Sequence, residues 1–282
     1  MNGIAPLLLA MLVGLLLPLV LVVPVHYRGR ARVRASKPPG WDGPGWRLWH
    51  VWLAFSLLIV AELLAFYLVQ PATFARLVSG ASSSSATDFA SAQAAFGRQL
   101  LWTSAAVGAT VLVILPLAPP RLLLATRWSV PRALGAGVLA FLALRIITVI
   151  LAPALPALGS DDHPQRELTE SLRLMTEQHS LWFTVLLAAL LAPIVEEILF
   201  RGVLLTGLAR RISFGWANAI QAALFASLHL TAPLFPIFFL MGLIAGELMR
   251  RSGGLLAPLT MHALNNVTAI LALRWLAERG SA

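Results

Sequence analysis

The sequence contains no cysteine and has few charged residues. Without cysteine, the chain can form no disulfide framework, thiolate nucleophile or cysteine metal cluster. Only 12% of the residues are charged and 59% are apolar, whereas an ordinary soluble domain is about 25% charged. A water-soluble globule is therefore not expected. Eight membrane-spanning helices would use about 160 residues, so the composition predicts an all-α, polytopic membrane bundle of about eight transmembrane helices.

Apolar runs predict where these spans lie. They cover about residues 4–25, 51–69, 100–117, 133–152, 181 onward, 214–230, 234–249 and 255–276. We divide the chain into residues 1–152, which hold four spans without a recognised motif, and residues 181–276, which hold the candidate catalytic core. Where the fifth span ends is the weakest boundary, because residues 198–208 stay apolar apart from Arg201.

The net charge of +9 is best explained by loops on the cytoplasmic side of a membrane. Arg28, Arg30, Arg32, Arg34 and Lys37 follow the first span, with no acidic residue before Asp42. This arrangement places both termini outside and most other arginines inside. We expect a multi-pass protein of a bacterial inner membrane, surrounded by membrane lipids. No nucleic-acid partner is expected, because the sequence shows no aromatic–basic interleaving of the kind that binds single strands.

Several reaction classes lack their motifs in this sequence. There is no His-Glu-x-x-His helix, no Gly-x-Ser-x-Gly elbow and no phosphate-binding glycine loop. The four aspartates lie outside the predicted spans, which excludes an aspartic dyad in the membrane. Ionisable residues within membrane helices are costly and are functional candidates by default. Of the reaction classes considered, catalysis by glutamate and histidine side chains therefore remains.

The first candidate group lies in the fifth predicted span. Glu197 and Arg201 are four residues apart, so on a helix they share a face and can form an ion pair. Glu196 is not explained in this way, because it points about 100° away from Glu197. Two adjacent carboxylates in a water-poor setting suit a general acid or base.

Two further groups follow on later helices. Phe225 and His229 are one turn apart, and so are His262 and Asn266. Taken alone, His229 could be a hydrogen-bonded core residue, and the pair His262 and Asn266 could form structural hydrogen bonds between helices. Histidine and asparagine on one face would also supply N–H donors to a common point.

Helix geometry brings the first two groups to one depth. The turn at residues 210–213 lies midway between Glu196 and His229, which places both about 25 Å from it, provided that the fifth helix continues past Arg201. His262 should lie about 14 Å from the turn at residues 252–254. This difference of about 10 Å would require tilted or broken helices.

Together, these motifs resemble those of the CPBP family, the CAAX-processing and bacteriocin-processing intramembrane proteases. The resemblance covers about residues 180–270 and rests on Glu-Glu-x-x-x-Arg, Phe-x-x-x-His and His-x-x-x-Asn in that order. It implies an intramembrane endopeptidase of the glutamic type without metal or cofactor. The resemblance assigns Glu196 and His229 to water activation, and His262 and Asn266 to the oxyanion. It leaves supporting roles to Glu197, Arg201 and Phe225.

Other functions stay open at this point. Glu196, His229 and His262 could be three zinc ligands with water in the fourth position. The buried glutamates and histidines could instead relay protons in a transporter, or the chain could be a membrane scaffold without activity. If it is a protease, its family suggests prenylated tails, bacteriocin-type leaders or C-terminal sorting signals as substrates.

Overall fold

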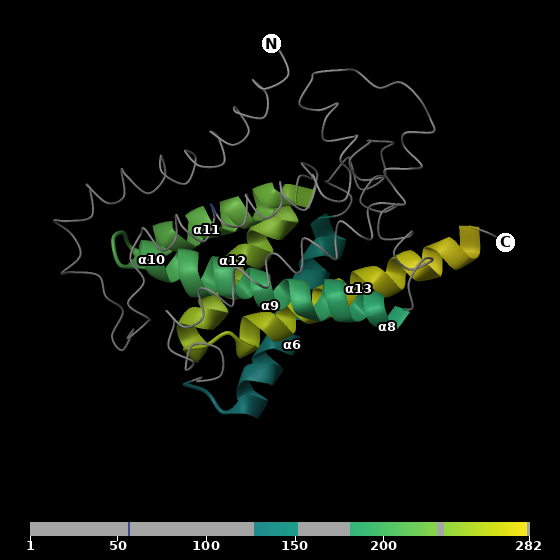
Figure 1. Ribbon diagram of the computed structural model, residues 1–282, viewed down its shortest axis with the longest axis horizontal. Coiled ribbons are helices and arrows are strands. Elements are labelled where there is room, and N and C mark those ends of the chain that lie inside the picture. Colours follow the sequence, from purple (N-terminus) through teal and green to yellow (C-terminus); the bar gives the residue numbers. More distant parts are fainter. Residues whose placement is uncertain (1–55, 57–126, 152–180, 230–233, 281–282) are drawn as a thin grey trace, which may run out of the picture.

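The computed structural model describes Ser56 and residues 127–151, 181–229 and 234–280. The described residues form helices and contain no strand, in agreement with the all-α prediction (Figure 1). Helix α6 spans Val130–Leu151, α11 spans Phe214–Leu228, α12 spans Phe235–Ser252 and α13 spans Leu256–Gly280. Apart from Ser56, the first three predicted spans lie outside the described residues, and so do residues 153–180.

The fifth predicted span is one continuous helix over Leu181–Ala209. It begins with α8 (Leu181–Thr184), η3 (Val185–Leu191) and α9 (Ala192–Glu197), and ends with η4 (Ile198–Leu205) and α10 (Thr206–Ala209). The two η segments are π-helical. Inside an α-helix the ring of Pro193 would clash with the carbonyl four residues earlier, and the wider π turn before it relieves this clash. The helix therefore continues past Arg201, as the depth comparison required.

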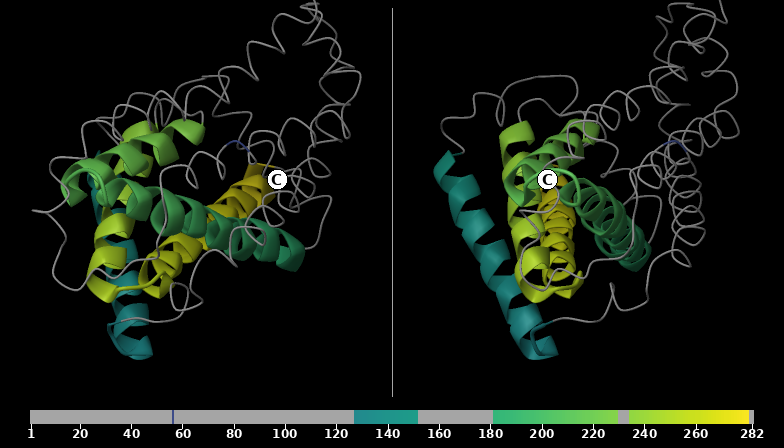
Figure 2. Two further views of the ribbon diagram at one scale, coloured as in Figure 1. Left: turned by 60° about the vertical axis from the view of Figure 1, so that its left-hand side comes forward. Right: turned by 90° about the vertical axis from the view of Figure 1, so that its left-hand side faces the viewer.

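Short connections join the helices as the sequence predicted. The turn at residues 210–213 separates α10 from α11. Gly253 directly follows the last residue of α12, and its positive φ of 76° gives the left-handed cap that favours glycine. Helix α13 then runs back across the fifth helix obliquely (Figures 1 and 2). This oblique crossing removes the depth mismatch expected for His262, because the two helices are not parallel.

Three of the described helices are long and apolar enough to cross a membrane: Val130–Leu151, Leu181–Ala209 and Leu256–Trp275. The outer face of α6 shows why, since its exposed side chains are large and apolar (Leu139, Leu142, Ile146, Val149 and Ile150). Helix α11 has only 15 residues, and α12 carries three charged residues within its 18. The predicted count of eight spans therefore stays a prediction, while the apolar helices indicate an integral membrane protein.

The two glycines of the seventh predicted span allow α12 to approach α11 closely. A Cβ atom on Gly242 would lie 2.8 Å from both Cα and Cβ of Ala222, and one on Gly246 would overlap the Asn218 side chain. Two α11 side chains then reach α12 backbone carbonyls. Asn218 Nδ2 donates to the Leu243 oxygen at 3.0 Å, and Gln221 Nε2 donates to the Gly242 oxygen at 2.8 Å.

We therefore predict that Gly242→Ala destabilises the protein by about 1–3 kcal/mol, because the added methyl group meets backbone that cannot move aside. Gly135→Ala on α6 is the matched control, since nothing lies within 4 Å of its added Cβ. The control should unfold at an unchanged or slightly higher temperature. Thermal unfolding of both purified variants in the same detergent measures the difference, and equal midpoints would contradict close α11–α12 packing.

Candidate functional site

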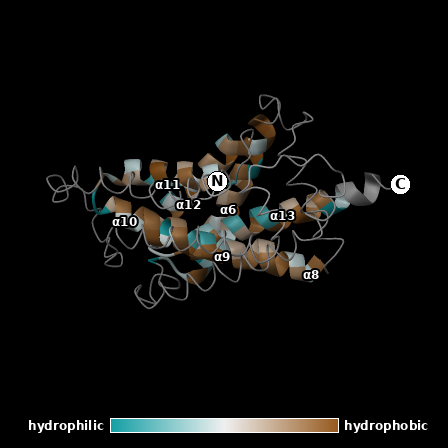
Figure 3. Cartoon of the chain, turned by 45° about the horizontal axis from the view of Figure 1, so that its top comes forward, coloured by the Kyte–Doolittle hydropathy of each residue, from teal (hydrophilic) through white to brown (hydrophobic). Residues whose placement is uncertain are grey.

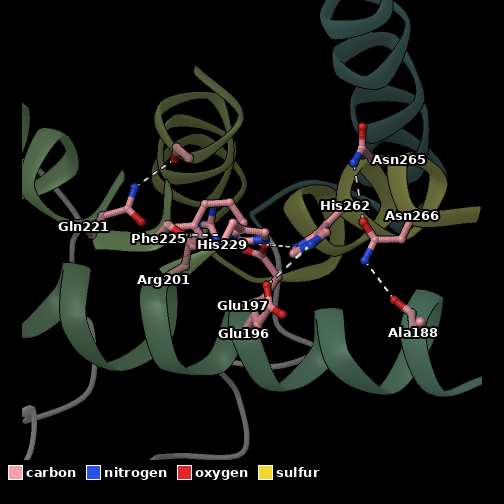
Figure 4. Close-up of polar contacts among 11 residues, drawn as sticks. Ala188, Glu196, Glu197, Arg201, Gln221, Phe225, His229, His262, Asn265 and Asn266 are labelled. Carbon is pink, nitrogen blue, oxygen red and sulfur yellow. Dashed lines mark hydrogen bonds and ion pairs between the residues drawn. The ribbon is translucent and has the colours of Figure 1, made fainter. Parts of the chain in front are cut away.

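The candidate residues meet where the middle of the fifth helix faces α11 and α13. Hydrophilic residues on α9 and α13 interrupt the otherwise mostly apolar helices there (Figure 3). Figure 4 shows side chains from the fifth helix, α11 and α13 turned toward one another. Residues more than 60 positions apart in the sequence thus share one polar cluster inside an apolar bundle.

The Glu197 carboxylate is the buried centre of this cluster. Its side chain is 1% exposed and that of Arg201 is 0% exposed, and their ion pair has 2.9 Å between Oε1 and Nη1. His262 Nδ1 donates to the same Oε1 atom, also at 2.9 Å. The ion pair expected from the four-residue spacing is therefore present, and through His262 the Glu197 carboxylate also contacts α13.

Phe225 lies at the apolar side of the cluster. The Arg201 guanidinium is 4.5 Å from the centre of its ring, at a distance typical of a cation–π contact. The rings of His229 and His262 have centroids 4.7 Å and 5.6 Å from that of Phe225. Phe225 thus packs against the Arg201 guanidinium and both imidazoles.

His229 is fixed at the end of α11. Its Nδ1 donates to the backbone oxygen of Phe225 at 2.8 Å, and its ring stacks on Phe238 of α12 with centroids 4.0 Å apart. Because Nδ1 carries the donated proton, Nε2 is the free nitrogen of a neutral ring. Both Glu196 and His262 lie close enough to act on His229 electrostatically.

Glu196 differs from Glu197 in what surrounds it. Its side chain is 30% exposed, and its Oε2 lies 3.6 Å from His262 Nε2. That oxygen is itself buried and has no hydrogen-bond partner among the described residues, which is also true of Glu197 Oε2. The rotation of about 100° between successive helix positions explains the contrast, since it turns Glu196 away from Arg201.

Asn266 lies beside the cluster and holds the fifth helix. Its Nδ2 donates to the Ala188 backbone oxygen at 2.8 Å, and its Oδ1 accepts from Asn265 Nδ2 at 3.4 Å. One N–H of the amide is therefore used between helices, and the other is free for another acceptor.

Two contacts near the site were missed by sequence reasoning. Asn265 is offset from His262 on α13 and is not part of the sequence motif, yet it accepts a hydrogen bond from Arg145 of α6. The stack of Phe238 on His229 had no signal in the sequence beyond a general excess of aromatic residues in α12. Among the residues that the structure describes, no group of three or more histidines or acids is arranged to hold a metal ion.

The buried position of Glu197 predicts a large effect of neutralising it. Glu197→Gln leaves Arg201 charged, buried and uncompensated, which costs about 3–5 kcal/mol. Glu247→Gln is the matched control, because Glu247 also pairs with arginines three and four residues later but lies near the surface. The control should lose at most about 1 kcal/mol. Unfolding temperatures of the two variants test this, and similar losses would contradict the central role of Glu197.

Comparison with known proteins bears on residues 178–268. This segment matches the family model described as Type II CAAX prenyl endopeptidase Rce1-like. No curated protein and no solved structure matches the chain significantly. The matched segment contains every candidate residue from Glu196 to Asn266 and leaves the first 177 residues outside. Residues 178–268 are therefore similar to Rce1-like CAAX protease domains, and the apolar helices indicate an integral membrane protein.

Proposed function

We propose that the protein is an intramembrane endopeptidase in which Glu196 and the two histidines activate a water molecule. One observation carries this proposal. Both imidazoles donate their Nδ1 proton to a separate acceptor, Phe225 O for His229 and Glu197 for His262. Both Nε2 atoms are thereby left for the site, beside a carboxylate oxygen that has no partner among the described residues.

Charge balance favours Glu196 as the general base. With both carboxylates ionised, both imidazoles neutral and Arg201 charged, the cluster has one net negative charge. A proton taken from water brings this charge to zero, and charge is unfavourable in a water-poor site. Glu197 is already held by Arg201 and His262, so Glu196 is the carboxylate that remains to accept the proton.

The same arrangement provides for the oxyanion. His262 Nε2 faces Glu196 and can exchange the abstracted proton with it. In the imidazolium form this nitrogen becomes a donor, so His262 stabilises the oxyanion only after the water has lost its proton. The second N–H of Asn266 adds a neutral donor. Donors aimed at developing charge in a water-poor site are worth about 3–4 kcal/mol each.

The substrate that we propose is a peptide or protein tail held at the membrane. The name of the matched family points to prenylated C-terminal tails. We also propose multi-pass insertion in a bacterial inner membrane. No metal or cofactor is part of the proposal.

Replacing Glu196 with glutamine keeps the shape of the side chain and removes the base. We expect cleavage of a farnesylated peptide with a CAAX-type end by the purified protein in liposomes to fall by about 10²–10⁴-fold. The unfolding temperature should change little, because Glu196 lacks the ion pair of Glu197. Glu247→Gln should cleave as well as the original protein. Cleavage at an undiminished rate by Glu196→Gln would refute the mechanism.

A comparison in cells identifies substrates without assuming their type. Membrane peptides from cells with the original protein should include fragments that are missing from cells with Glu196→Gln.

Metal removal separates the proposal from the zinc alternative. We expect full activity after incubation with a chelator and dialysis, and much less than one zinc ion per purified chain. Activity that is lost on chelation and restored by zinc would instead favour Glu196, His229 and His262 as ligands.

A further inference from the structure

We propose that Arg145 is a positioning residue, which fixes the orientation of the Asn266 amide through Asn265. This inference rests on the proposed function, since it assigns Asn266 a donor role there. Its structural part concerns three side chains on α6 and α13 and can be tested without any activity.

An arginine within a membrane-spanning helix calls for an explanation, because a charge there is costly. Arg145 lies on α6, whose neighbouring side chains are apolar. Its guanidinium donates from Nη2 to Asn265 Oδ1 and lies 5.7 Å from the ring centre of Phe141. Its buried Nε has no hydrogen-bond partner among the described residues. The hydrogen bond of Arg145 within the described residues thus goes to Asn265, which directly precedes Asn266.

The hydrogen bonds continue from Arg145 in one direction. Asn265 accepts at Oδ1 from Arg145 and donates from Nδ2 to Asn266 Oδ1 at 3.4 Å. Asn266 in turn donates from Nδ2 to the Ala188 backbone oxygen at 2.8 Å. The chain of bonds therefore connects α6 with η3 through two successive side chains of α13.

The groups at the two ends of this chain permit only one orientation of each amide. A guanidinium has only donors, so Asn265 must turn its oxygen toward Arg145. A backbone carbonyl has only acceptors, so Asn266 must turn its nitrogen toward Ala188. Reversing either amide would place two donors or two acceptors against each other. Arg145 thus supplies one of the two ends that hold the Asn266 N–H group in place.

Spectra of the side-chain amides test this relay directly. The chain has only four asparagines, Asn2, Asn218, Asn265 and Asn266, so selective ¹⁵N labelling gives four side-chain signals. Arg145→Met should shift the signals of Asn265 and Asn266 and leave that of Asn218 unchanged. Thr148→Val is the control on the same helix, because the hydrogen bond of Thr148 within the described residues goes to Leu144 of that helix, and it should shift neither signal. An unmoved Asn266 signal in Arg145→Met would overturn the inference.

Asn265→Asp separates positioning from stability. Aspartate keeps an acceptor for Arg145, so the fold should hold, but it cannot donate to Asn266 Oδ1. We expect roughly a tenfold loss of kcat at an unchanged unfolding temperature, with KM for the farnesylated peptide nearly constant. Full kcat in this variant would contradict the proposal.

A double-mutant cycle completes the test. Arg145→Met should lower kcat roughly tenfold in the original protein but much less in Asn266→Ala. In that background the amide that Arg145 would orient is already absent. Equal losses in both backgrounds would overturn the inference and leave the protease proposal intact. Absence of cleavage by the original protein would count against the protease proposal, while the amide spectra would still decide whether the relay exists.

Discussion

The arrangement of the site depends on one buried carboxylate. Glu197 lies where water cannot solvate it, so its charge must be met by neighbouring groups. A single oxygen takes the guanidinium of Arg201 and the ring N–H of His262. Arg201 in turn lies over Phe225 of α11. The fifth helix, α11 and α13 are thus held together by one charge, and the candidate catalytic side chains are placed as a consequence.

The division of labour between two adjacent glutamates follows from helix geometry. Glu197 is turned toward its partners and is occupied by them, whereas Glu196 is turned away and reaches the accessible side of the same cluster. The π-helical turns on either side of α9 set this helix segment apart from the regular α-helix around it. Such turns occur often at functional sites, and here they bracket both adjacent carboxylates.

Sequence reasoning succeeded where local spacing decides the outcome. The four-residue ion pair of Glu197 and Arg201 and the turn at 210–213 both follow from residues near one another in the chain. It failed where angles between helices decide. The depth of His262 was misjudged because the helices were treated as parallel, and the contact between Arg145 and Asn265 joins residues 120 positions apart. The catalytic roles themselves stay proposals, as does the count of eight spans.

The absence of cysteine makes the central claim open to direct measurement, because introduced thiols are the only ones in the chain. The claim is that positions 196 and 262 face each other across the fifth helix and α13. In the double variant Glu196→Cys, His262→Cys, a short bifunctional thiol reagent applied to membranes should join the two helices. A protease site introduced into the turn at 210–213 would reveal the link as uncut chain on a denaturing gel. The pair Ile194→Cys, His262→Cys, with the first thiol on an exposed position, should stay unlinked. Linkage of the control alone, or of neither pair, would contradict the convergence on which the proposed mechanism depends.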